Sequence, residues 1–135
     1  MSVDDRSVPP ALKAAFGLCL VAAVLMLLAA FAALSDLPRA TGTTIRLNLG
    51  VVGGVNLLVA LIMAAVVPRL RTPGKAGLGA RRALALGGAA SIAVSVLGLV
   101  TQTVGVAILG HVIVLAFAML ALYRPAVSAF LRAAR

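Results

Sequence analysis

Four long apolar runs separated by short polar segments are the feature that most constrains how this chain folds. They cover about residues 14–34, 45–67, 83–100 and 104–122 of a 135-residue sequence. A chain crossing hydrocarbon must satisfy its own backbone hydrogen bonds, and a helix of roughly 20 residues does so over the required length. The sequence therefore predicts an all-α membrane protein, a single transmembrane four-helix bundle over residues 1–135.

The composition agrees with a membrane protein and excludes an ordinary soluble domain. The chain is 63% hydrophobic and 11% charged, with a mean hydropathy of +1.18, whereas soluble domains are about half apolar and about a quarter charged. A net charge of +9 would suggest nucleic-acid binding in a soluble protein. Here the cations lie in connections and tails, so we expect them to meet lipid head groups and not nucleic acid.

The segment 68–82, between the second and third runs, carries five cations and no acid. These cations are Arg69, Arg71, Lys75, Arg81 and Arg82. Short basic loops mark the cytoplasmic side of a membrane, so this loop predicts that both termini are cytoplasmic. Its glycines predict a flexible loop. One interpretation is that its cations only anchor the topology, and the other is that they contact anionic lipid or an acidic partner. The excess of Arg over Lys and the abundance of Ala suggest a bacterial source, and hence the inner membrane.

Small residues recur at helical spacing in the second and third runs. The second run contains Gly50 and Gly54, and the third contains Ala83, Gly87, Ser91 and Ser95, each four residues after the one before. Small residues at this spacing let two membrane helices approach closely. We therefore expect both faces to be helix-packing surfaces, within the chain or against a partner.

The tail, residues 123–135, has a different pattern. Pro125 stands where the first turn of a helix tolerates proline. Polar residues fall on one helical face and apolar residues on the other, namely Ser128, Arg132 and Arg135 opposite Val127, Phe130, Leu131 and Ala134. The tail is predicted to be a short cytoplasmic amphipathic helix on the membrane surface or an extension of the fourth span.

Four polar side chains fall near the middle of the apolar runs: Asn56, Ser91, Ser95 and His111. All lie within about two helical turns of the predicted midplane. Polar groups in hydrocarbon are costly without partners and often mark functional sites. One interpretation is a functional polar layer in which His111 accepts a proton or binds a ligand. The other is interhelical hydrogen bonding that only fixes helix pairing, worth about 0.6 kcal/mol per bond.

The chemistry that the sequence lacks points away from an enzyme. No Asp, Glu, Lys or Arg lies in the middle of a run, and no cluster of His, Cys and carboxylates offers a metal site. Gly74-Lys75 lacks the remaining residues of a phosphate loop. We therefore expect no catalytic residue, no metal and no cofactor.

Among non-catalytic roles, the best interpretation is an accessory, assembly or regulatory subunit. It would act through helix–helix contacts with another membrane protein or with further copies of itself. The alternative is a small oligomeric transporter or channel lined by the polar layer. A third class, a cofactor-binding subunit using His111, predicts an absorbing species on purification.

Overall fold

The computed structural model describes residues 8–133, and this range is helical without a β-strand. Its α-helices are α2 (Pro10–Asp36), α3 (Thr43–Val66), α4 (Lys75–Val100), α5 (Leu109–Leu122) and α6 (Pro125–Ala133). Short 3-10 turns are η1 (Leu37–Arg39) after α2, η2 (Val67–Arg71) after α3 and η3 (Val106–Ile108) before α5. The prediction of an all-α fold is confirmed.

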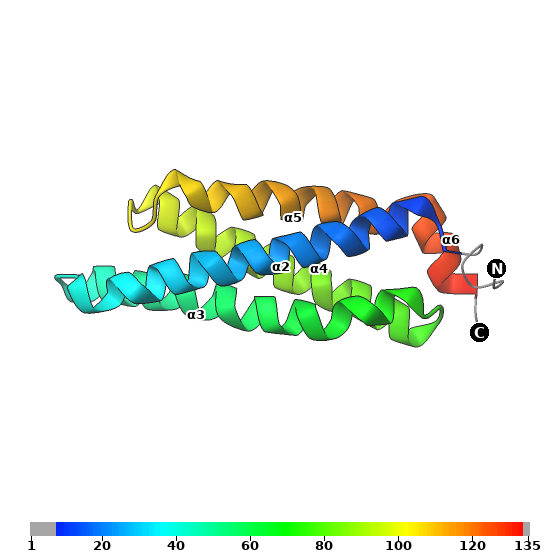
Figure 1. Ribbon diagram of the computed structural model, residues 1–135, viewed down its shortest axis with the longest axis horizontal. Coiled ribbons are helices and arrows are strands. Elements are labelled where there is room, and N and C mark those ends of the chain that lie inside the picture. The colour runs from blue at the N-terminus through cyan, green and yellow to red at the C-terminus, as the bar shows by residue number, and fades with distance from the viewer. Residues whose placement is uncertain (1–7, 134–135) are drawn as a thin grey trace.

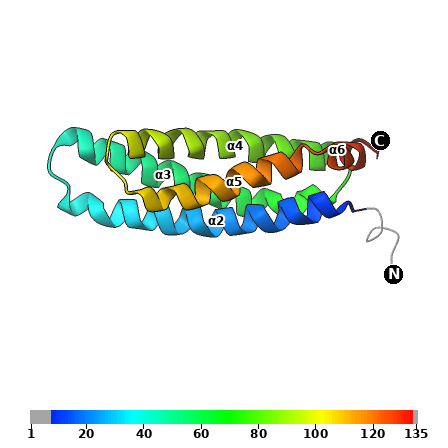
Figure 2. The ribbon, with the colours of Figure 1, turned by 90° about the horizontal axis from the view of Figure 1, so that it is seen from above.

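Helices α2 to α5 lie side by side with alternating directions, and α6 crosses one end of them (Figure 1). The perpendicular view shows the same arrangement (Figure 2). The start of α2, the α3–α4 connection and α6 share this end, while the α2–α3 and α4–α5 connections share the other. Helix α2 packs along both α3 and α5, and α3 also packs along α4.

Three helical segments are long and apolar enough to cross a membrane: Pro10–Arg39, Thr43–Arg71 and Lys75–Val100. Helices α5 and α6 pass the same test only together, as one span bent by 59°. Alone, the 14 residues of α5 extend about 21 Å at 1.5 Å per residue, less than the roughly 30 Å of a hydrocarbon core. The chain thus has three to four helices apolar enough to span a membrane.

The expected loop over residues 68–82 is wrong in its second half, because α4 begins at Lys75. Gly74, with a φ of 95°, makes the turn before the helix. The following residues read KAGLGARR, in which Lys, Ala, Leu and Arg are good helix formers and outweigh two glycines. The basic segment is therefore a short 3-10 turn followed by two helical turns.

Gly77 contributes close packing to this segment and not flexibility. A Cβ atom at Gly77 would collide with the backbone oxygen of Thr72 and would lie 2.6 Å from Cδ2 of Leu131. The nearby Gly74 N–H donates a hydrogen bond to the Leu131 oxygen at 2.8 Å. The missing side chain therefore allows α6 to dock against the start of α4.

The fourth apolar run begins its α-helix later than the predicted residue 104. Thr101 ends α4 and Gln102 adopts a φ of 58°, a left-handed conformation that interrupts a helix. The chain then passes through η3 before α5 begins at Leu109. The connection between α4 and α5 is therefore longer than the expected turn 101–103.

Helix α6 forms as the amphipathic pattern predicts, but it is not an extension of α5. It begins at Pro125 after the 59° bend. Its apolar residues Val127 and Leu131 are 0% exposed, so protein, and not lipid, covers this face. Ala134 and Arg135, which the sequence placed on the same helix, lie outside the described residues.

Helix α4 contributes a buried seam in steps of three and four residues, the spacing of a helix packed against other helices. The positions are Gly77, Arg81, Leu84, Gly88, Ser91, Ser95 and Gly98. Of the four residues of the predicted face, the two serines lie on this seam. Ala83 and Gly87 are half-buried beside it, and a Cβ at Gly87 would lie 3.2 Å from Val59.

In α3 the close helix contact is made by Gly53 and not by Gly50 and Gly54. A Cβ at Gly53 would lie 2.7 Å from Cγ of Leu34, whereas one at Gly50 or Gly54 would meet nothing within 4 Å. The predicted pair is therefore not a packing contact within the described chain. The correct glycine is one helical position away because α2 approaches the neighbouring face of α3.

Candidate functional site

The four polar residues singled out from the sequence meet in space and form what we call the polar cluster. Asn56 comes from α3, Ser91 and Ser95 from α4, and His111 from α5. Asn56, Ser91 and Ser95 are 0% exposed and His111 is 2% exposed. Three helices thus bring together residues that are up to 55 positions apart in the chain, as the shared depth of their positions predicts.

Helical geometry explains how each side chain reaches the cluster. Ser91 and Ser95 are one turn apart on the buried seam of α4, so both hydroxyls point to the same side. Asn56 follows the buried Val52 by one turn on α3. His111 lies in the first turn of α5, opposite the two serines.

Hydrogen bonds connect all members of the polar cluster. Ser91 Oγ donates to Asn56 Oδ1 at 2.5 Å. Asn56 Nδ2 donates to the Val52 carbonyl at 2.9 Å and to Ser95 Oγ at 3.4 Å. Nε2 of His111 lies 3.3 Å from Ser91 Oγ and 3.2 Å from Ser95 Oγ.

The positions of the protons follow from these partners. The Ser91 proton goes to Asn56, and both amide protons of Asn56 are used. The Ser95 proton then has Nε2 of His111 as its acceptor among the described residues. We assign the ring proton to Nδ1 and leave Nε2 unprotonated, because this tautomer gives the Ser95 proton an acceptor. For Nδ1 the described part of the chain provides no hydrogen-bond partner.

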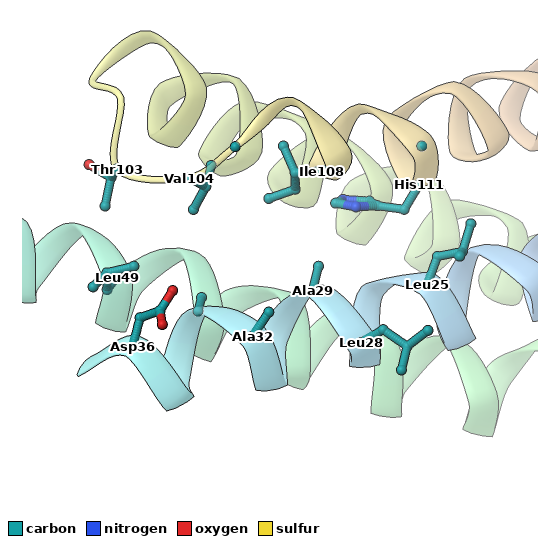
Figure 3. A pocket seen from close by; sticks show the side chains of 13 residues that line it. Leu25, Leu28, Ala29, Ala32, Asp36, Leu49, Thr103, Val104, Ile108 and His111 are labelled. Carbon is teal, nitrogen blue, oxygen red and sulfur yellow. The ribbon is translucent and has the colours of Figure 1, made fainter. Parts of the chain in front are cut away.

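A cavity of about 330 Å³ adjoins the polar cluster between α2 and the start of α5. Most of its wall is apolar, including Leu25, Ala29 and Ile108, and His111 lies at its inner end (Figure 3). Asp36 lies at its outer rim. The imidazole thus joins a buried hydrogen-bonded cluster to a space that a small molecule can occupy.

Arg81 forms a second polar site, which the sequence did not predict. It is 7% exposed, and its Nη1 donates to Ser128 Oγ at 2.8 Å and to the Leu122 carbonyl at 3.4 Å. Its guanidinium carbon lies 4.5 Å from the centroid of the Tyr123 ring. We call Arg81, Leu122, Tyr123 and Ser128 the arginine site. It ties the start of α4 to the end of α5 and to α6.

The other four cations of the predicted basic loop are exposed: Arg69, Arg71, Lys75 and Arg82. Among them, the Arg71 guanidinium lies 4.5 Å from the centroid of the Phe16 ring. These four remain candidates for contact with lipid or a partner, whereas the contacts of Arg81 are used inside the protein. A signal for this difference is present in the sequence, because Arg81 continues the three- and four-residue spacing of the α4 seam.

Within residues 8–133 no group of three or more His, Cys, Asp or Glu residues could hold a metal ion. The fold and the polar cluster define a general class, an all-helical protein with three to four helices apolar enough to span a membrane. No protein-family model, no curated protein and no solved structure matches the chain. The interpretation of the site therefore rests on its geometry.

Proposed function

We propose that this chain is a non-enzymatic integral membrane protein, an accessory, assembly or regulatory subunit that acts through helix–helix contacts. In this proposal all four apolar helices span a bacterial inner membrane, α5 together with its neighbouring turns. The observation that carries the proposal is an outward-facing apolar stripe on α3 with small residues at its centre.

The stripe contains Leu47, Val51, Gly54, Leu58 and Leu61, spaced by four and three residues. Leu47, Val51, Leu58 and Leu61 are between 47% and 64% exposed. Gly54 is exposed and Gly50, beside the stripe, is half-buried. Neither glycine has a neighbour that an added Cβ would meet within 4 Å. A partner helix could approach closely here, because small residues allow backbones to meet and lipid gives no competing hydrophobic gain.

The charge distribution supports an orientation with both termini in the cytoplasm. The end that holds the start of α2 and helix α6 carries Lys13, Arg69, Arg71, Lys75, Arg81, Arg82, Arg124 and Arg132. The opposite end carries Arg39 and Arg46, together with Asp36. An excess of Lys and Arg favours the cytoplasmic side. Reporter fusions at the two ends of the chain test this orientation.

Purification from native membranes at native expression, followed by mass spectrometry, tests the proposed role. We expect a protein partner in stoichiometric amount. In the variant Gly50→Leu/Gly54→Leu we expect that partner to be lost, because two leucines fill the gap on the outward face. The control is Gly17→Leu, since Gly17 on α2 is also exposed with nothing within 4 Å of an added Cβ. A partner-free chain, or equal partner loss in the control, would contradict the proposal.

The second candidate function is an oligomeric transporter or channel lined by the polar cluster. The cavity beside His111 favours it, whereas the complete burial of Asn56, Ser91 and Ser95 opposes it. A permeation path has to contain water. If the polar cluster lines such a path, the cysteine of Ser95→Cys in a Cys19→Ala background reacts with a membrane-impermeant thiol reagent. The accessory role predicts no reaction at this position while the chain is folded.

A further inference from the structure

The cavity beside His111 has the properties of a small-molecule site. Its volume of about 330 Å³ is near the lower end of the roughly 300–1,000 Å³ range of such sites, which are largely apolar with few polar groups. His111 is 2% exposed and lines the inner end of the cavity. It is thus a buried polar side chain at the inner end of a mostly apolar space.

The hydrogen bonds of His111 specify what this site can recognise. Nε2 lies 3.2 Å from Ser95 Oγ, and in the tautomer assigned above it accepts the Ser95 proton while the ring proton stays on Nδ1. Among the described residues Nδ1 has no hydrogen-bond partner, and it is not one of the fully buried atoms without a partner, so a molecule in the adjoining space can reach it. Helix α5 also begins here without a side-chain cap at Ile108, and the start of a helix favours partial negative charge. Both features call for a ligand with an oxygen acceptor.

The charges around the cavity select an uncharged ligand. Its lining contains no Lys or Arg, and its one ionisable rim residue is Asp36. The Asp36 carboxylate is paired with Arg39 at 3.8 Å, and both side chains are more than half exposed. This pair offers neither an anion nor a cation a net opposite charge at the rim, and the charge of either ligand would be desolvated deeper in the cavity. A neutral molecule avoids this cost.

We propose that the cavity binds an uncharged, membrane-soluble molecule whose carbonyl oxygen accepts a hydrogen bond from Nδ1–H of His111. This site is separate from the outward stripe on α3, so it does not depend on the proposed partner. The apolar part of the ligand would lie against Ala29, Ala32 and Ile108.

The single histidine of the chain gives a direct test. The full chain, labelled with ¹⁵N-histidine and placed in lipid nanodiscs, is titrated with 9-fluorenone, an inert aromatic ketone. Fluorene, which lacks the carbonyl oxygen, is the matched probe. We expect fluorenone to shift the Nδ1 resonance in a saturable manner, with Nε2 retaining the shift of an unprotonated nitrogen. Fluorene should leave the Nδ1 resonance in place.

Two variants locate the binding, which is measured by native mass spectrometry of the nanodiscs. In His111→Gln the terminal amide can keep the bond to Ser95 while Nδ1–H is lost, so fluorenone should bind about fivefold more weakly. Ala32→Leu fills the exposed side of the cavity and should weaken binding at least tenfold. Ala64→Leu, on an exposed face of α3 outside the cavity, should bind like the wild type.

Several outcomes would overturn the proposal. One is the absence of any saturable shift with fluorenone. Another is an equal Nδ1 shift with fluorene, which would remove the role of the carbonyl. Unchanged affinity in both His111→Gln and Ala32→Leu would place binding elsewhere. A phospholipid that stays on the wild-type chain and excludes fluorenone would identify an acyl chain as the occupant.

Discussion

The polar cluster and the arginine site both hold polar groups inside an apolar helical protein, but they do so in different ways. The polar cluster is neutral, and its four residues satisfy one another except at Nδ1 of His111, beside the cavity. The arginine site holds a charge at the end of the bundle that contains α6. Within the described chain it has no carboxylate partner, and its buried Nε has no hydrogen bond.

The difference follows from the cost of burial at each place. A charge in the centre of hydrocarbon is costly, so in the proposed membrane-spanning arrangement only neutral groups with mutual partners are tolerated at the position of the polar cluster. Near the end of the helices, a carbonyl from the last turn of α5 and an aromatic face stabilise a guanidinium. The dipole of α5 favours a cation near its C-terminal end, where the Leu122 carbonyl lies. The Tyr123 ring adds a cation–π contact. The polar cluster therefore depends on matched hydrogen bonds. The arginine site depends on the carbonyl, the helix dipole and the aromatic ring beside it.

Gly77→Ala should have the largest effect of these substitutions, because it disturbs the packing of α6 against the start of α4, next to the arginine site. The added methyl group would collide with the Thr72 carbonyl and with Leu131, and α6 would have to move. We expect a loss of about 3 kcal/mol in the free energy of unfolding, the upper part of the range for overpacking. Titration with sodium dodecyl sulfate in mixed micelles measures this loss.

Gly79→Ala is the matched control, since a Cβ at Gly79 would meet nothing within 4 Å. Alanine is the better helix former, so this variant should be as stable as the wild type or more stable by up to about 1 kcal/mol. Equal losses in the two variants would mean that helix α6 does not dock at Gly77.

Asn56→Leu removes hydrogen bonds from the polar cluster. Ser91 Oγ loses its acceptor, Asn56 Oδ1, which lies 2.5 Å away. The larger leucine side chain must then fit against the Ser91 hydroxyl. We expect a loss of about 2 kcal/mol, within the cost of a buried unsatisfied polar group. The same detergent titration measures it.

Asn48→Leu is the control for this change on the same helix. Asn48 is half-buried and makes one hydrogen bond of 3.4 Å, to Thr103. Its loss should cost about 0.5 kcal/mol, near the average for polar contacts between membrane helices. A larger loss at Asn48 than at Asn56 would show that the polar cluster is not a stabilising unit.

Arg81→Lys tests whether the arginine site depends on guanidinium geometry or on charge alone. Lysine keeps the positive charge but not the planar fork or its stacking on an aromatic ring. We expect a loss of about 1 kcal/mol and faster amide hydrogen exchange in residues 125–133. Arg82→Lys, at an exposed neighbour, should change neither quantity. Unchanged exchange in Arg81→Lys would mean that charge alone holds α6.

The comparison also explains what the sequence could predict. The polar cluster was predictable because Asn56, Ser91, Ser95 and His111 stand out in apolar runs and their depth follows from helical rise. The arginine site was not predicted, because a cation just after a glycine-rich stretch resembles a loop charge until α4 is known to begin at Lys75. Gly53 was missed because the exact face on which α2 meets α3 depends on tertiary packing. The same holds for the cavity, which requires α2 and α5 to be placed together.

The smallest effects should separate the two serines of the polar cluster. Ser91 gives its proton to Asn56 at 2.5 Å, whereas Ser95 makes contacts of 3.4 Å and 3.2 Å. Ser91→Ala should therefore cost about 1 kcal/mol and Ser95→Ala about half as much. In Ser95→Ala, however, Nε2 of His111 loses its donor, and the ring proton is free to move from Nδ1 to Nε2. The ¹⁵N resonances of His111 should report this change in Ser95→Ala and not in Ser91→Ala. The reverse result would mean that Ser91 and not Ser95 sets the tautomer of His111. The hydrogen bond that leaves the proton on Nδ1 would then come from Ser91.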